Sequence, residues 1–276
     1  MTLQHMQKIQ PMTTPAASST PAHQDILIHT EAGVSTITIN RTDKKNSITA
    51  AMYGILADAL DSASCDAAVR VVVIQGHETI FSAGNDISDF LSTPPDHAGA
   101  PVFRFMRGIS TFAKPIVASV CGPAVGIGTT LLLHCDLVFA GDNAAFSMPF
   151  VNLGLCPEAG SSLLVPQLMG HQRAAEALLL GEPFMAETAL ELGMINRIVP
   201  PAEANALAQR QAQKLAAKPL SALLETKRLM KQGNAALVAA RIEEEGASFG
   251  RMLAEPAARE AFLAFIEKRR PDFSKV

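Results

Sequence analysis

The chain has 276 residues, of which 48% are hydrophobic, and a formal net charge of -3. This length and composition allow one large domain, or a main domain with a smaller appendage, around an ample apolar core. A charge so close to neutral gives no basic field for nucleic acid or an anionic membrane, and no apolar run is uninterrupted for long enough to span a bilayer. We therefore expect a cytoplasmic protein with no nucleic-acid or membrane partner.

The first 24 residues are polar and rich in Pro, Ser and Thr, without the apolar centre of a secretory signal or the arginines of a transit peptide. Residues 1–24 are expected to be a disordered tail. The four cysteines form no CxxC pair, and three of them lie in apolar runs. This pattern indicates reduced thiols in a reducing compartment and no metal site.

The next part of the chain alternates between strand and helix patterns. DILIHT and VSTITIN, separated by EAG, predict a hairpin, and helical spacing follows from Ile48 to Leu60 with Asn46 or Ser47 as the expected N-cap. RVVVIQG, KPIVASVCG and CDLVFAG then predict buried strands with helix-like segments between them. The order predicts an α/β core with parallel strands over residues 25–201.

Residues 202–276 contain four helical stretches with charged faces and no strand-like run between them. We expect a separate C-terminal helical region. Helices with an apolar stripe and a charged face often bury the stripe against another subunit, so this region predicts a homo-oligomer.

Two glycine-bearing turns follow predicted strands: FSAGNDISDF at 81–90 and CGPAVGIGTTLLLHCD at 121–136. Glycines let the backbone approach a ligand closely, and a helix that follows begins with N–H groups that have no partner. Two such turns side by side would offer two N–H donors to one oxygen, which is what stabilisation of an enolate requires. Each turn alone is more typical of a simple tight turn than of a site, and neither matches a dinucleotide fingerprint or a P-loop.

These turns, with INRTDKKNSITAAMYGILADAL before them and FIEKRRPDF near the end, resemble four motifs of the crotonase superfamily, also called the enoyl-CoA hydratase/isomerase family. The resemblance covers residues 25–273. It implies a crotonase-like α/β fold, with a spiral core of ββα repeats and a C-terminal helical oligomerisation region that forms trimers or dimers of trimers. It also implies an acyl-CoA thioester substrate and no cofactor beyond the coenzyme A that the substrate carries.

Carried over by position, the resemblance implies that the backbone N–H groups of Asn85 and Ile127 are the oxyanion donors. The coenzyme A contacts that it implies are made by Ala83, Asp86, Ile87 and Lys268, or an arginine beside Lys268. Asp86 has a second interpretation, which we favour, as the cap of the following helix. Lys44 and Lys45 either approach the pantetheine or pyrophosphate or are simply solvated.

The side chains must decide the reaction, because members of this family share the oxyanion site and differ in their acids and bases. Hydratases of the family use two glutamates, and this sequence has Thr130 and Phe150 at those positions. Glu158, in LGLCPEAGSS, instead resembles the sole acid/base of the Δ3,Δ2-enoyl-CoA isomerases. One carboxylate suffices there, because it takes a proton from C2 and returns it to C4 on the same allylic face.

Glu158 also has a plainer interpretation, as a solvent-exposed residue that follows Pro157 at a helix start. In the catalytic interpretation, an apolar wall would exclude water and raise the pKa of the carboxyl. The expected wall consists of Thr130, Phe150, Leu155, Leu163 and Leu164. His134 is expected to be a packed residue, and Tyr53 suggests no role.

The sequence therefore predicts a Δ3,Δ2-enoyl-CoA isomerase of fatty acid metabolism. A hydratase or another acyl-CoA enzyme of the same family, and a non-catalytic binder of CoA thioesters, stay open as alternatives. The Pro- and Gly-bearing segment STPPDHAGAPVFRFM, at 92–106, is expected to be a mobile loop that shapes the acyl tunnel.

Overall fold

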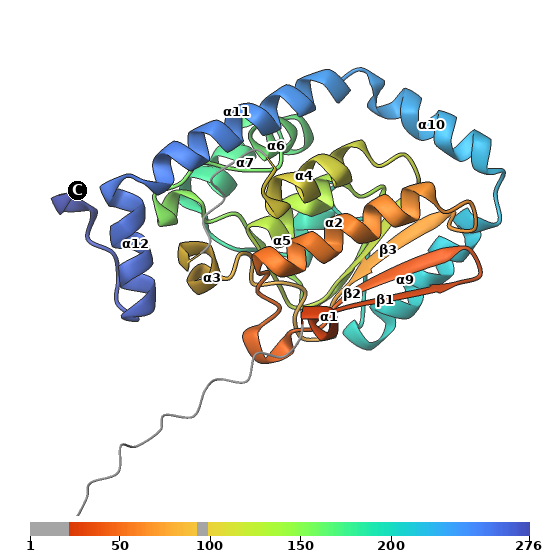
Figure 1. Cartoon of the computed structure of the whole chain (residues 1–276), viewed down its shortest axis with the longest axis horizontal. Helices are drawn as coiled ribbons and strands as arrows, with labels where there is room; N and C mark the ends of the chain where they lie inside the picture. The colour runs from red at the N-terminus through yellow and green to blue at the C-terminus, as the bar shows by residue number, and fades with distance from the viewer. Residues whose placement is uncertain (1–21, 93–98) are drawn as a thin grey trace, which may run out of the picture.

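The computed structural model describes residues 22–92 and 99–276. Its main element is a six-stranded sheet in the order β1-β2-β3-β4-β6-β9 (Figure 1). The strands are β1 (Ile26–Glu31), β2 (Val34–Ile39), β3 (Val71–Gln75), β4 (Ile116–Val120), β6 (Leu137–Gly141) and β9 (Arg197–Val199). β1 and β2 form an antiparallel hairpin, and every other neighbouring pair is parallel. The predicted hairpin and parallel α/β core are confirmed.

A second sheet of three short strands lies beside the first and was not predicted. It consists of β5 (Pro123–Val125), β7 (Ala145–Ser147) and β8 (Phe184–Met185). Strands of two or three residues are too short to show a period-2 pattern in a sequence. This sheet matters for function because β5 leads directly into the second glycine turn.

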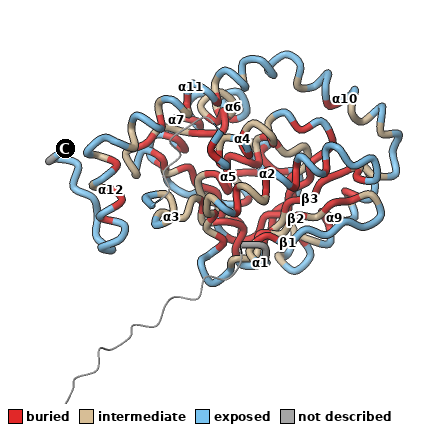
Figure 2. The backbone as a smooth tube through the Cα atoms, in the orientation of Figure 1, coloured by how far each residue is buried: buried red, intermediate tan, exposed pale blue. Residues whose placement is uncertain are grey.

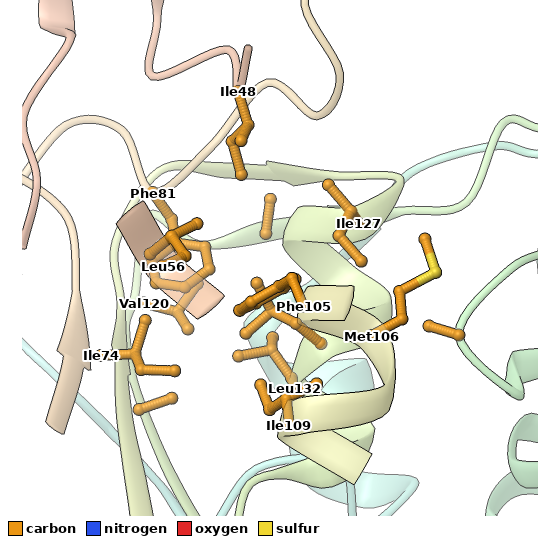
Figure 3. Packing of buried hydrophobic residues seen from close by; sticks show 14 of the residues in the cluster. Ile48, Leu56, Ile74, Phe81, Phe105, Met106, Ile109, Val120, Ile127 and Leu132 are labelled. Atoms are coloured by element: carbon orange, nitrogen blue, oxygen red, sulfur yellow. The ribbon is translucent and has the colours of Figure 1, made fainter. Parts of the chain in front are cut away.

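Helices cover both faces of the main sheet, and successive strand residues point to opposite faces. Val72 and Ile74 of β3 belong to the cluster that includes α2 (Ala50–Cys65) and α4 (Pro101–Thr111), shown closely in Figure 3. Val71 and Val73 pack instead with α9 (Pro201–Ala216), through Leu207, Ala208 and Ala212. The predicted division between a core at 25–201 and a helical region from 202 onward falls at the start of α9. This helix packs on the sheet of the core, on the other side of that division.

The predicted N-cap of α2 is wrong. Thr49 caps the helix, since its side chain accepts a hydrogen bond from the backbone N–H of Met52 at 3.2 Å. Asn46 is buried with a left-handed φ of 54°, and its side-chain amide donates to three backbone carbonyls, those of Ile39, Ile80 and Phe81. Asn46 therefore ties the loop before α2 to the first glycine turn.

The last three helices form an arch along one side of the molecule (Figure 1). They are α10 (Leu220–Gln232), α11 (Ala235–Leu253) and α12 (Pro256–Ile266). Most of α10 is exposed (Figure 2), whereas α11 packs against α4 and against α6 (Ser161–Met169). The four predicted C-terminal helices are thus present, with α9 in the core and the other three beyond it.

The remaining elements are α1 (Ala22–Asp25), η1 (Thr42–Lys44), α3 (Ile87–Ser92), α5 (Ile127–Thr130), η2 (Leu131–His134), η3 (Val151–Leu153), α7 (His171–Ala175), η4 (Glu176–Leu180), α8 (Ala186–Glu191) and η5 (Phe273–Lys275).

Two predictions about loops fall partly outside the described residues: the tail at 1–24, except for residues 22–24 in α1, and positions 93–98 of the loop at 92–106. The loop prediction is wrong from Pro101 onward, where α4 begins with proline in its first turn. The residues Val102, Phe105, Met106 and Ile109 give this helix its buried face. In the described ranges, no helix combines the length and the apolar character needed to cross a bilayer.

Candidate active site

The two glycine turns lie against each other. The backbone N–H of Val125 donates to the carbonyl of Ser82 at 2.9 Å, and that of Ser82 donates to Pro123 at 3.1 Å. Gly84 has a left-handed φ of 86°, and a Cβ at this position would stand 2.8 Å from the carbonyl oxygen of Val125. Only glycine allows this close approach of the two backbones.

The predicted oxyanion donors, Asn85 and Ile127, come directly after these contacts. Asn85 follows Gly84, and Ile127 is the first residue of α5 after Gly126, which has a φ of 57°. Neither backbone N–H has an acceptor among the described residues. The side chain of Ile127 is fully buried and lies near Phe105 and Met106 in Figure 3, so it packs the core while its amide stays unpaired.

A pocket of about 600 Å³ opens beside this pair of turns. It brings together several predicted residues, because Asn85 lines it together with Ala83, Asp86, Ile87, Phe150, Leu155, Lys44 and Lys45. The aromatic residues Phe262 and Phe265 of α12 form part of its wall. The pocket therefore combines the unpaired amide of Asn85 and two lysines with apolar rings, whereas Ile127, the other predicted donor, does not line it.

Asp86 caps the helix that follows it and also forms an ion pair. Its carboxylate accepts a hydrogen bond from the N–H of Asp89 at 3.1 Å and pairs with the Arg41 guanidinium at 2.6 Å. Partial burial works against ionisation, but the hydrogen bonds and the positive charge of Arg41 prevail and lower the pKa of this carboxyl. The favoured capping interpretation agrees with the geometry, and the ion pair anchors the first glycine turn to the loop before α2.

Glu158 is buried, with only 5% of its surface exposed, so the interpretation as a solvent-facing residue is wrong. Its Oε1 has no hydrogen-bond partner among the described residues. Burial raises the pKa of the carboxyl to about 8, with a further contribution from the negative charge of Glu245. An unpaired buried carboxyl is costly to a fold, and such perturbed groups concentrate at functional sites.

A second, small cavity of about 10 Å³ contains Glu158 and is otherwise lined by apolar groups. Phe90 and Phe249 line both this cavity and the large pocket, and their rings meet edge to face with centroids 6.0 Å apart. The cavity has room for about one water molecule at most. The rings of Phe90 and Phe249 thus stand between the cavity of Glu158 and the pocket lined by Asn85.

Tyr53, for which the sequence suggested no role, is hydrogen-bonded to the first glycine turn. Its hydroxyl donates a short hydrogen bond to the side-chain carbonyl of Asn85. Burial raises its pKa well above the usual value, and the negative charge of Glu158 adds to the shift. Tyr53 therefore holds the residue that bears one of the unpaired amides.

Several predicted residues lie elsewhere. Thr130 is fully buried and lines neither cavity around the turns, and Lys268 is exposed and does not line the pocket. Leu164 lines a different pocket, between α4 and α10, and Leu163 lines none of these. His134 is packed, as expected: its Nε2 lies 2.7 Å from the carbonyl oxygen of Ala159, and burial lowers its pKa to about 4.

The contribution of α11 to the site was not predicted from the sequence. Ile242, Glu245, Gly246 and Phe249 occupy positions i, i+3, i+4 and i+7 of one helix face, and all but Glu245 line the cavity of Glu158. A glutamate within an apolar stripe was the available signal. It was hidden because Glu245 is the third of three consecutive glutamates, which together look like a solvated face.

The described residues show no metal centre, since no group of three or more His, Cys, Asp or Glu is placed to hold an ion. All four cysteines are free thiols.

Comparison with known proteins identifies the family. Residues 29–275 match the model of the enoyl-CoA hydratase/isomerase family. The chain is 36% identical over 251 residues to enoyl-CoA delta isomerase 2 of Rattus norvegicus, covering 88% of this chain and 64% of that protein. It is 30% identical to 2,3-dehydroadipyl-CoA hydratase of Escherichia coli, over 90% of this chain and 98% of that one. The structure of Pseudomonas aeruginosa OdaA superposes with a TM-score of 0.86 at 48% identity, covering 88% of this chain and 99% of that one. The crotonase fold, the two adjoining glycine turns and these matches together show that the chain belongs to the enoyl-CoA hydratase/isomerase family.

Proposed function

We propose that the protein moves a double bond from C3 to C2 of an enoyl-CoA, with Glu158 as the only acid/base. The observation that carries the proposal is the buried, unpaired carboxyl of Glu158 in an apolar cavity next to the pocket lined by Asn85. The site as proposed needs no metal and no cofactor, because coenzyme A is part of the substrate.

The proposed reaction begins with the carboxylate of Glu158 taking a proton from C2. The electrons of the broken C–H bond pass into the thioester and the alkene, which gives a dienolate with negative charge on the thioester oxygen. The protonated Glu158 then returns the proton to C4, and the double bond settles between C2 and C3. Atoms and charge balance, and the enzyme ends as it began.

The N–H groups of Asn85 and Ile127 are proposed to bind the thioester oxygen. Both are unpaired and adjoin at the contact between the two turns, and preorganised donors of this kind stabilise developing charge without reorganisation. Loss of one such donor typically costs about 2.7–4 kcal/mol of transition-state stabilisation. Tyr53 supports this arrangement through its hydrogen bond to the Asn85 side chain.

The apolar surroundings favour isomerisation over hydration. A carboxyl whose pKa is about 8 is a stronger base than an ordinary glutamate, which suits removal of a weakly acidic proton from carbon. Phe90, Phe249 and Phe150 offer no group that could hold a water molecule for addition to the alkene. A hydratase would have to replace the two glutamates for which this chain has Thr130 and Phe150.

The coenzyme A portion is proposed to lie in the large pocket. Ala83 and Ile87 line it beside Asp86, and Lys44 and Lys45 also line it, where they can meet the negative charge of the pyrophosphate. Lys268 would reach the ligand only if the C-terminal segment moved or a second subunit supplied it. We propose a trimer or a dimer of trimers, because the outer helices α10 and α12 expose large apolar side chains that include Leu229, Met230, Phe265 and Ile266.

The first test offers a 3-enoyl-CoA and a trans-2-enoyl-CoA in separate cuvettes and follows the ultraviolet absorbance of the conjugated thioester. The proposal expects a rise with the first substrate and no change with the second. A fall with the second substrate would mean hydration, and no change in either would support a binder without catalysis.

The second test is Glu158→Gln, which keeps the volume of the side chain and removes its acid/base function. We expect binding of a CoA ester, followed by calorimetry, to be retained while turnover falls about 10²–10⁴-fold, the usual contribution of general acid/base catalysis. Glu244→Gln, at an exposed position of α11, is the control for loss of one negative charge. Retained turnover in Glu158→Gln would remove this residue from the mechanism.

A further inference from the structure

The loop that carries Glu158 has an unusual backbone. Ala159 and Gly160 both have left-handed φ angles, of 59° and 73°. An alanine in this region is strained, and such a conformation persists only where surrounding contacts determine it. The contacts that hold this loop therefore bear on where the carboxyl of Glu158 points.

Glu245 of α11 makes two of these contacts from 85 residues farther along the chain. Its carboxylate accepts hydrogen bonds from the backbone N–H of Gly160 at 2.6 Å and of Ser162 at 2.9 Å. His134 makes a further contact with the loop, with Nε2 2.7 Å from the carbonyl oxygen of Ala159. The strained turn is thus fixed at its amides by one helix and at a carbonyl by another segment.

Glu245 is itself buried, with 5% of its surface exposed, but it lines neither the cavity of Glu158 nor the large pocket. Both carboxylate oxygens are occupied by loop amides, so the group has no free oxygen aimed at a substrate. Its influence on chemistry must therefore pass through Glu158. The same helix face also supplies Ile242 and Phe249 to the cavity wall.

We propose that Glu245 is a positioning residue for the reaction: its carboxylate clamps the loop after Glu158 through two amides and keeps a second negative charge beside the catalytic carboxyl. The proposal rests on the function proposed above. In this arrangement α11 both aims the base and strengthens it, because a neighbouring anion disfavours ionisation of Glu158.

The other ionisable groups around the loop are few. Tyr53 of α2 and Cys156 of the same loop stay uncharged in the neutral range, since burial raises the pKa of each. Burial keeps His134 neutral. Burial raises the pKa of Glu245 itself, against the opposing effect of its hydrogen bonds from Ser162 and Gly160 and of the positive charge of Arg241, which donates to the hydroxyl of Ser162 at 3.0 Å. Lys231, which donates to the carbonyl of His134 at 3.5 Å, and Lys227 act on His134, and Arg251 acts on Cys156. Glu245 is therefore the anion with the greatest influence on Glu158.

The test measures the titration of Glu158 directly, through the infrared C=O band of its protonated carboxyl, assigned by the disappearance of this band in Glu158→Gln. Glu245→Gln removes the charge and turns a donor toward one of the two loop amides. We expect the inflection of Glu158 to move to lower pH, the inflection of kcat/KM to move with it, and the plateau of kcat/KM to fall. A folded Glu245→Gln protein whose Glu158 titrates as in the wild type would overturn the proposal.

Two variants sharpen the result. Glu244→Gln neutralises the adjacent, exposed glutamate that pairs with Arg241 at 3.1 Å, and it should leave both inflections unchanged. Glu245→Asp keeps the charge on a side chain one methylene shorter, so the inflection should stay high while the plateau of kcat/KM falls. If the titration of Glu158 shifts as far in Glu244→Gln as in Glu245→Gln, the shift is a general effect of charge, and this result would contradict the clamp.

The wild-type protein provides the measurement if Glu245→Gln does not fold. Its Glu158 must titrate well above 4.5, the ordinary value, and an inflection near that value would overturn the proposal by itself. Failure of the two proposals can be told apart. Turnover that survives Glu158→Gln contradicts the proposed function, whereas an essential Glu158 whose titration ignores Glu245 contradicts only the clamp.

Discussion

At the scale of single residues, the site depends on one carboxyl that the fold leaves unsatisfied. Oε1 of Glu158 has no partner among the described residues, although Glu245 nearby has both of its oxygens hydrogen-bonded. Two buried glutamates in the same region therefore have different environments. The satisfied one fits a structural role, and the unsatisfied one fits a role with substrate.

The raised pKa of Glu158 predicts the pH dependence of the reaction. The proposed base must be ionised to take a proton, so kcat/KM should increase about tenfold per pH unit below the pKa of about 8 and level off above it. The measurement is the initial rate with a 3-enoyl-CoA at a series of pH values from about 5.5 to about 9.5. A profile that is flat through pH 6–9 would contradict the raised pKa.

The same shift predicts how stability depends on pH. The folded-state pKa is about 8 and the ordinary value is 4.5, so between these values the folded state retains a proton that the unfolded state has lost. Glu158 thus lowers the free energy of unfolding progressively as pH rises from about 4.5 to 8. We expect Glu158→Gln to become more stable than the wild type over this window, in urea unfolding at several pH values. A difference between the two proteins that does not change with pH would contradict this prediction.

At the scale of elements, two turns from different sheets create the proposed oxyanion site. Gly84 follows the main-sheet strand β3, and Gly126 follows β5 of the small sheet. Hydrogen bonds from Val125 to Ser82 and from Ser82 to Pro123 align the two turns. Either turn alone would supply only one N–H donor. Their contact brings together the glycines that precede the two unpaired amides, and one of these amides, that of Asn85, belongs to a residue that lines the large pocket.

Gly84→Ala tests this contact. The new Cβ would lie 2.8 Å from the Val125 carbonyl oxygen at a φ of 86°, so we expect a loss of about 1–3 kcal/mol in stability and a marked fall in kcat. Gly54→Ala is the matched control, because Gly54 lies within α2 and a Cβ there meets no atom within 4 Å. It should stabilise the protein by about 0.5–1 kcal/mol. Equal effects in thermal unfolding would show that the contact is unimportant.

The sequence predicted elements better than it predicted contacts. Strand and helix patterns located β1 to β4, β6 and the helices from α9 to α12, because period-2 and period-3.6 signals are local. Phe90, Phe249 and Glu245 meet Glu158 or its loop from distant segments, and no local pattern encodes such a meeting. The lone charge at Glu158 was the exception, since a single glutamate in an apolar stretch is visible in the sequence itself.

At the scale of the whole molecule, the outer helices are unlike the rest of the structure. Figure 2 shows α10 largely exposed, and its residues Leu229 and Met230 have 57% and 77% of their surfaces accessible. A pocket of about 500 Å³ lies between this helix and α4. Exposed apolar side chains on a projecting helix favour contact with another copy of the chain.

The proposed assembly can be tested by its mass in solution. We expect light scattering to give a multiple of three chains for the wild type, and Leu229→Glu with Met230→Glu to shift the mass toward the monomer, because charged side chains are costly in an apolar interface. Leu27→Glu, at an exposed position of β1 on another surface, is the control and should leave the mass unchanged. A monomeric wild type at micromolar concentration would contradict the assembly.

The bond between Glu245 and Gly160 also sets an order of events during synthesis. A ribosome-bound chain that has emerged as far as α9 contains every strand of both sheets, together with both glycine turns and Glu158. It lacks α11, and with it the groups that hold the loop at Gly160 and Ser162. The nascent protein could therefore complete its sheets while still inert, and it would gain a poised base only when its last quarter folds back onto it.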